Sequence, residues 1–311
     1  MPHDSRKVVY AALAGNIAVA ISKFMVAALS GSTAMMAEAI HSTVDTGNEL
    51  LLLVGMWQSR KPASPAHPFG RGREVYVWSF LVVIMMFAFG GGLSLLDGLK
   101  SIRHPQPLQS QNWAYLVLGL SALFESASFM VGIRALLSRR RKGRTVWETV
   151  RHSKDPNVMG VVFEDSAALV GLVLATVGVW SSHHFQMPQL DGGASVAIGC
   201  LMGLVAILFG REVKDLLVGE AADPEVVDWI RTVTASDPDI ESAGDPVTMQ
   251  LGPGQVLLNI ELRFREGLDR DGIEAAIDRI EAGIRRKSPE VTRIFIEAES
   301  LKPRRDGSAA A

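Results

Sequence analysis

The 311-residue chain has a single cysteine, Cys200, which lies within an apolar run. Disulfides and thiolate metal sites both need several cysteines, so neither can be central to this protein. The chain also has almost no net charge, because 31 Lys and Arg stand against 33 Asp and Glu. Phosphate binding needs a basic excess, so this composition argues against a nucleic-acid partner.

No cleavable signal peptide is evident in the sequence either. The first apolar run is long and lacks a small-residue A-x-A end, so we interpret it as a true membrane span. Apolar residues, in contrast, are abundant. They make up 48% of the chain, and the mean hydropathy of +0.21 is too high for an ordinary soluble enzyme of this length.

The apolar residues are concentrated before about residue 210, in runs of roughly 20, the length that crosses a ~30 Å hydrocarbon core. The loops after the second and fourth runs are rich in Lys and Arg, whereas "SGSTA" and "SSHHFQMPQLDGG" contain neither. The positive-inside rule therefore places both termini and the basic loops in the cytoplasm, with Lys100 and Arg103 as a minor exception. The sequence predicts six transmembrane helices, at about residues 8–30, 33–57, 77–99, 112–138, 157–181 and 191–212.

The remainder of the chain is charged and periodic, as in a soluble domain. "DPEVVDWIRTVTAS" predicts an amphipathic helix, and "PVTMQLGPGQVLLNIELRF" predicts two strands joined at Gly252-Pro253-Gly254. A helix from about Arg270 to Lys287 and a strand "VTRIFIEAES" follow. This order predicts a small α+β domain with helices on one face of a three-stranded sheet. We expect a six-helix transmembrane domain over 1–212, a cytoplasmic dimerisation domain over 213–300 and a disordered tail over 301–311.

The second predicted span, "AEAIHSTVDTGNELLLL", contains five ionisable or amide side chains. Their spacing of i, i+3, i+7, i+10 and i+11 places them on one helical face: Glu38, His41, Asp45, Asn48 and Glu49. Charged groups in a span cost ~2.5 to 3.5 kcal/mol each on insertion scales and normally face the bundle interior for a function. A histidine and a carboxylate four residues apart can bind one ion together. The alternative is a structural hydrogen-bond network between helices.

The fifth predicted span, "NVMGVVFEDSAALVGL", contains a second polar cluster. Asp165 lies two turns after Asn157, and Glu164 lies beside Asp165 in sequence but about 100° around the helix. Two adjacent carboxylates in a span are hard to explain by packing. The alternative is a structural ion pair with Lys23 of the first span, which suits Glu164 better than Asp165.

The motif "HSTVD" in the second span, "HPFGRGREVYVWSF" in the next loop, the acidic motif of the fifth span and the small α+β tail resemble the cation diffusion facilitator family. This family contains proton-coupled zinc and manganese exporters, and the resemblance covers nearly the whole chain. It is strongest to the branch that includes the animal mitochondrial zinc transporter, whose fifth span also has an "ED" pair and whose tail lacks histidines. The resemblance implies a ferredoxin- or metallochaperone-like tail.

The family's transport site takes two ligands from the second span and two from the fifth. The resemblance implies that His41 and Asp45 are the first pair and that Asp165 matches the family aspartate, while Val161 replaces the family histidine. The fourth ligand is then Glu164, Asn157 or water, or the ion is held by three groups. We predict a metal site of His41, Asp45, Asp165 and Glu164.

The family's other metal sites are poorly matched. Of its cytoplasmic loop site only His67 remains, with Ser64 and Arg71 at neighbouring positions, and arginine cannot lose its proton to become a ligand. No histidine follows His184, and carboxylates such as Glu297 and Glu299 alone would make a poor zinc site. We therefore expect a metal-free tail that serves dimerisation, and no resident cofactor.

The resulting functional hypothesis is a homodimeric exporter that exchanges a divalent cation for protons, moving zinc, or manganese, iron or cobalt, out of the cytoplasm. Metal binding requires neutral imidazole and ionised carboxylates, so the ion and protons compete for the same groups. By resemblance, the short tail and absent transit peptide favour a bacterial inner membrane. Two alternatives are a membrane-embedded metalloenzyme, for which no additional acid, base or substrate cleft is evident, and a non-transporting scaffold or metal sensor that retains the fold.

Overall fold

The computed structural model describes residues 3–105, 111–138, 145, 148–149 and 154–298. Contacts between residues divide the chain into two compact units. The first comprises Met1–Lys61 and Glu74–Lys214, and the second comprises Pro62–Arg73 and Asp215–Ala311. The tail predicted over 301–311 lies outside the described residues.

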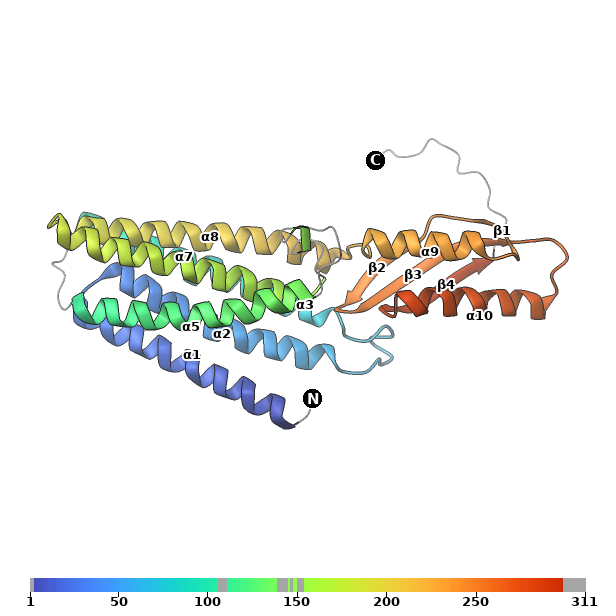
Figure 1. Cartoon of the computed structure of the whole chain (residues 1–311), viewed down its shortest axis with the longest axis horizontal. Coiled ribbons are helices and arrows are strands. Elements are labelled where there is room, and N and C mark those ends of the chain that lie inside the picture. Colours follow the sequence, from blue (N-terminus) through green and yellow to red (C-terminus); the bar gives the residue numbers. More distant parts are fainter. Residues whose placement is uncertain (1–2, 106–110, 139–144, 146–147, 150–153, 299–311) are drawn as a thin grey trace, which may run out of the picture. The chain divides into compact units, whose positions relative to one another are not determined.

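The first unit is a bundle of long helices that run alongside one another (Figure 1). All six predicted spans are helical. Three short elements, the second of them a π-helix, join into one continuous helix over Glu74–Arg103. The elements are α1 (His3–Ser30), α2 (Thr33–Ser59), α3 (Glu74–Met85), η1 (Met86–Leu93), α4 (Ser94–Arg103), α5 (Gln111–Ser138), α7 (Pro156–His184) and α8 (Gln189–Val218).

Within the described residues, four helical segments are long and apolar enough to cross a membrane: Glu74–Arg103, Asn112–Arg134, Val158–His184 and Gln189–Val218. The apolar part of α1 over the described side chains is shorter, Asn16–Ser30. Helix α2 contains Glu38, Asp45 and Glu49, which lower its apolar character. The four apolar helices identify the chain as an integral membrane protein. The polar residues of α2 require an explanation, because this helix lies inside the bundle.

Helix α2 has neighbours on several sides, because it contacts α1, α3, η1, α4 and α7. Its first turn is held by two side chains. The hydroxyl of Ser32 accepts a hydrogen bond from the Met35 amide at 3.1 Å. The buried carboxylate of Asp191, at the start of α8, accepts from the Thr33 and Ala34 amides at 2.6 and 3.1 Å. A carboxylate is favourable at a helix N-terminus, where amide groups lack partners within the helix, so Asp191 fixes α2 to α8.

The third span approaches α8 closely through glycines. A Cβ atom added at Gly98 would lie 2.7 Å from the Val196 nitrogen, and one added at Gly199 would lie 2.6 Å from the Leu95 nitrogen. Larger residues would push the helices apart. Small residues at such contacts are the usual means by which helices pack closely in membranes.

The second unit contains a mixed sheet whose middle strand is β3. Strand β3 is parallel to β4 on one side. On the other side it is antiparallel to β2 through Gln255–Asn259 and to β1 through Leu262–Phe264. The elements are α9 (Pro224–Ser236), β1 (Ile240–Ala243), β2 (Val247–Gly252), β3 (Gln255–Phe264), α10 (Arg270–Lys287) and β4 (Val291–Ala298).

The prediction of three strands was wrong, because the described residues form four. Strand β1 is four residues long and only Ile240 among them is buried, so it has no alternating apolar pattern to detect. The other elements are confirmed, including the β2–β3 hairpin, in which Gly254 has a φ of 67° that favours glycine. Helices α9 and α10 cover the face of β3 that contains Leu258 and Ile260, and the core includes Ile230 and Ile284 from these helices.

The loop Pro62–Arg73, which connects α2 to α3, belongs to the second unit. The ring of Phe69 lies edge-on to Phe295 of β4, with centroids 6.3 Å apart. Gly72 lies against the β2 backbone, where an added Cβ would come within 2.5 Å of the Leu251 carbonyl oxygen. The Arg73 guanidinium donates to the carbonyl of Leu217. The loop is therefore packed onto the α+β unit through side-chain and backbone contacts.

Candidate metal site

The polar face of α2 points into the helix bundle. Glu38 and Asn48 are fully buried, and the exposed fraction of His41 is 1%. Nδ1 of His41 lies 3.5 Å from a carboxylate oxygen of Asp45, one turn along the same helix. Neither ring nitrogen of His41 has a hydrogen-bond partner among the described residues, and nor does that oxygen of Asp45. Buried polar atoms are normally paired, so these atoms are available to a ligand.

A cavity of about 130 Å³ lies beside this face. Its walls include Asp45 and Glu49 from α2, Glu125 from α5, and Glu164 and Asp165 from α7. Five carboxyl groups from three helices thus surround one small space. Such a concentration of acidic groups within a membrane bundle favours a cationic occupant.

Both carboxylates of the fifth predicted span line this cavity. Ser128 hydrogen bonds to Asp165. The other Asp165 oxygen, Oδ2, is buried without a partner in the described part of the chain. Glu164 accepts a hydrogen bond of 2.7 Å from the amide nitrogen of Asn48. The side chain of Asn157, the alternative fourth ligand, lies outside the described residues.

The alternative of an ion pair between Lys23 and Glu164 was wrong, because Lys23 has other partners. Its ammonium lies 3.2 Å from Glu38 and 3.8 Å from Glu125, and it donates to the Ser42 hydroxyl at 2.7 Å. The partner of Glu164 is neutral Asn48. Glu164 is therefore not explained as the counter-ion of the buried lysine.

The predicted ligands are only partly gathered. His41 and Asp45 form one pair on α2, and Glu164 and Asp165 form a second on α7, but His41 is not among the residues that line the cavity. Across the described residues, no three His, Cys, Asp or Glu side chains come close enough to hold one metal ion. The structure thus presents two facing half-sites rather than a closed coordination shell.

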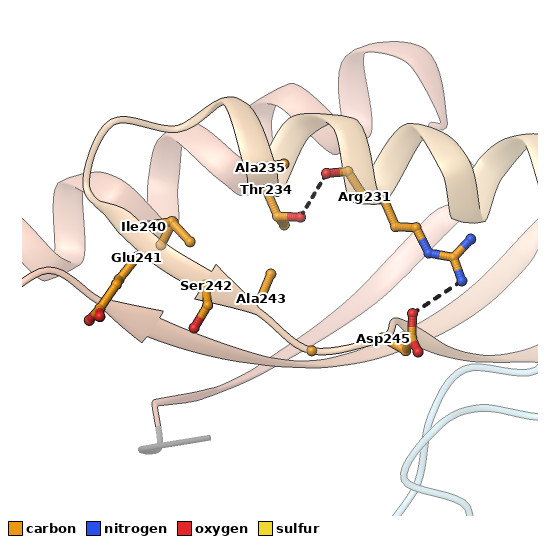
Figure 2. Close-up of a pocket in the computed structure, with 9 residues that line it drawn as sticks. Arg231, Thr234, Ala235, Ile240, Glu241, Ser242, Ala243 and Asp245 are labelled. Carbon is orange, nitrogen blue, oxygen red and sulfur yellow. Dashed lines mark hydrogen bonds and ion pairs between the residues drawn. The ribbon is translucent and has the colours of Figure 1, made fainter. Parts of the chain in front are cut away.

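The other candidate positions show little metal-binding character. His67 is exposed, and its backbone forms a tight turn with Ser64 through hydrogen bonds of 2.9 and 3.1 Å. In the second unit, a hollow of about 290 Å³ lies between the end of α9 and β1 (Figure 2). Its one long basic side chain, Arg231, is already paired with Asp228 and Asp245 at 3.0 and 3.2 Å.

The sequence does not predict the capping role of Asp191 or the partner of Asn48. Asp191 is the first residue of the sixth predicted span, and its carboxylate caps α2 from α8. Asn48 was placed on the polar face, but its partner Glu164 is 116 residues away. The sequence shows only that each residue is polar within or beside a membrane span. That observation does not identify the residue it contacts.

Comparison with known proteins matches most of the chain to one protein family. A family model described as the cation efflux transmembrane domain matches residues 9–218. The chain is 33% identical over 267 residues to the mitochondrial proton-coupled zinc antiporter SLC30A9 of Mus musculus, covering 86% of this chain and 46% of the relative. It is 30% identical over 261 residues to metal tolerance protein C4 of Arabidopsis thaliana, covering 84% and 57%.

A bacterial relative is matched over a larger share of its own length. The cation-efflux pump FieF of Klebsiella pneumoniae (strain 342) is 26% identical over 262 residues, which cover 84% of this chain and 81% of the pump. In contrast, the chain spans about half the length of the mitochondrial relatives, 46% in the mouse protein.

Proposed function

Because the chain belongs to the cation efflux family of membrane transporters, we propose that it exports a divalent cation, zinc foremost, in exchange for protons. Membership in a transporter family removes the metalloenzyme alternative. The proposal includes six membrane spans, with α1 and α2 completing the set of apolar helices. The observation that carries it is the acidic cavity between α2, α5 and α7, which is lined by Asp45 from one half of the predicted ligand set and by Glu164 and Asp165 from the other.

The ion would be bound by His41, Asp45, Glu164 and Asp165. The unpartnered atoms of His41, Asp45 and Asp165 support this assignment, because each has a lone pair without a hydrogen-bond donor in the described residues. Since these atoms form two half-sites on α2 and α7, binding would draw the two helices together. Rocking of the helices would then present the closed site to one side of the membrane and the open site to the other.

Coupling to protons follows from the chemistry of the ligands. Imidazole must be neutral and carboxylates ionised to bind a metal, so a proton-loaded site has to lose protons when the ion enters. One imidazole and three carboxylates form a harder ligand set than two imidazoles and two carboxylates. Manganese, iron and cobalt therefore remain candidate substrates beside zinc.

We further propose that the protein is a homodimer that associates through the face of its sheet opposite to α9 and α10. Val247, Asn259 and Phe295 form a row across β2, β3 and β4 on the side opposite to the α9–α10 core. Val247 and Phe295 are 65% and 47% exposed, and Phe69 adds a third exposed apolar side chain. An apolar patch of this kind on a small domain marks an interaction surface.

Zinc uptake into proteoliposomes under an imposed pH gradient tests the transport proposal. We expect accumulation of zinc, together with proton movement in the opposite direction, that stops when the gradient is collapsed by an ionophore. A scaffold or sensor would bind zinc in detergent without accumulating it. We propose the cytoplasmic membrane of a bacterium as its location, with both termini in the cytoplasm.

A further inference from the structure

Asn48 and Glu164 form the buried polar contact that joins α2 to α7 beside the cavity. The Asn48 amide nitrogen donates to Glu164 Oε1 at 2.7 Å, and the exposed fractions of the two residues are 0% and 6%. Asn48 lies three residues after Asp45, and Glu164 directly precedes Asp165. The hydrogen bond therefore connects the two half-sites to each other.

The chemistry of the amide makes this contact directional. An asparagine NH₂ group is always a donor and does not titrate, so the oxygen it contacts is always an acceptor. Glu164 Oε1 is thus fixed in place, while the Glu164 side chain still lines the cavity next to Asp165. The Asn48 oxygen is itself buried and accepts no hydrogen bond from the described residues, so the contact to Glu164 is the one that orients the amide.

A second amide–carboxylate pair in the same bundle provides a comparison. Asn16 of α1 donates to Glu49 of α2, also at 2.7 Å, but this pair is only partly buried. Glu49 is not among the predicted ligands, whereas Glu164 is the candidate for the missing fourth ligand. Both carboxylates line the cavity, and the Glu164 pair differs in being buried and in joining α2 to α7, the helices that contain the two half-sites.

We propose that Asn48 is a positioning residue that holds Glu164 as the fourth ligand of the transported divalent cation, in place of the ligand that Val161 cannot supply. This inference rests on the proposed transport function. Asn48 orients one carboxylate oxygen toward its own amide and leaves the other directed to the ion. Partners that orient metal ligands in this way typically contribute a factor of about 10 to 100 to metal affinity.

Zinc affinity of the full-length protein in detergent, measured by calorimetry, tests the inference without requiring transport. Asn48→Leu keeps the side-chain size but removes the donor, and we expect the zinc Kd to rise by about 10- to 100-fold. Ser195→Ala is the matched control, because it removes an equally buried hydrogen bond between helices, from Ser195 to the Ser94 carbonyl at 2.9 Å. We expect its zinc Kd to equal that of wild type.

The double variant separates positioning from a general structural role. If Asn48 acts through Glu164, then Asn48→Leu has no further effect on zinc affinity in a Glu164→Gln background, because residues in one network are not additive. Independent, additive losses, or an Asn48→Leu affinity equal to wild type, would overturn the inference. Asn48→Ser, too short to reach Glu164, replaces Asn48→Leu if the latter is not monodisperse.

Flux measurements distinguish failure of the Asn48 inference from failure of the proposed transport function. In proteoliposomes, Asn48→Leu is expected to raise the zinc KM with little change in kcat, as for loss of an interaction made equally in the bound and transition states. A wild-type protein that binds zinc but does not transport it would refute the transport proposal, and the calorimetric result for Asn48 would still stand.

Discussion

The ammonium of Lys23 lies 3.2 Å from a carboxylate oxygen of Glu38, and both side chains are completely buried within the bundle. An ion pair in such a place stabilises the fold only while both partners are present, because either charge alone is left without water. The pair therefore predicts an asymmetric response to mutation.

We expect Lys23→Met to destabilise the protein by roughly 3 to 5 kcal/mol, because Glu38 loses its counter-ion. Lys23→Met combined with Glu38→Leu should recover most of that loss. Thermal unfolding in detergent, followed by the loss of monodisperse protein, measures both. Ser42→Ala, which removes a neutral partner of Lys23 but leaves the ion pair, serves as the control. A double variant as unstable as Lys23→Met alone would contradict this account.

We expect His41→Ala and Asp45→Asn each to abolish zinc flux under a pH gradient while leaving the protein folded and dimeric. The two side chains form the α2 half-site, with 3.5 Å between Nδ1 and the carboxylate. Thr43→Ala is the control, because Thr43 lies between them in sequence but is exposed on another face of α2. Robust flux in either site variant would remove these residues from the site.

We expect Asp165→Asn to abolish transport and Val161→His to raise the preference for zinc over manganese. Val161 lines the cavity and lies one turn before Asp165 on α7, so an imidazole there faces the same space. We expect the new imidazole to take the fourth position from Glu164, which leaves two imidazoles and two carboxylates, a set that suits tetrahedral zinc. Competition between the two metals in a flux assay measures the preference. An unchanged preference, with transport intact, would show that the site does not extend to position 161.

We expect Phe295→Asp to weaken dimerisation, because it replaces an exposed apolar side chain by a charge on the sheet face opposite to α9 and α10. Analytical ultracentrifugation in detergent over a range of concentrations reports the change. Ala275→Asp introduces the same charge on the exposed face of α10 and should leave the dimer intact. Equal behaviour of the two variants would place the interface elsewhere.

We expect Asp191→Ala to destabilise the bundle by about 2 kcal/mol, the upper range for loss of a helix cap. The Asp191 carboxylate serves two amides and the hydroxyls of Ser32 and Thr33, and its exposed fraction is 1%. Asp191→Asn should be milder, since its oxygen still accepts. Thermal unfolding in detergent compares the two, and equal losses would mean that the contact acts by charge rather than by capping.

Most helices of the bundle could be predicted because they are long apolar runs, and those of the α+β unit because their periodicity is clear. Strand β1 could not, since a four-residue strand with one buried side chain has no measurable period. The polar face of α2 was also predictable from spacing alone. The contacts of each polar group could not be predicted, because helical spacing says nothing about the rotation of one helix against another. Lys23 is an example, since it lies beside Glu38 and not beside Glu164.

The loop Pro62–Arg73 has a consequence for how this protein can be divided. Because that loop packs on the sheet, the chain passes between the two units three times: after Lys61, after Arg73 and after Lys214. A domain attached by a single linker can be deleted or exchanged in one cut. Here a truncation after Lys214 also removes the strands that Phe69 and Gly72 pack against, and so destabilises the loop that connects α2 to α3. The two units are therefore not separable modules, and a chimaera with another transporter must exchange the loop together with the tail.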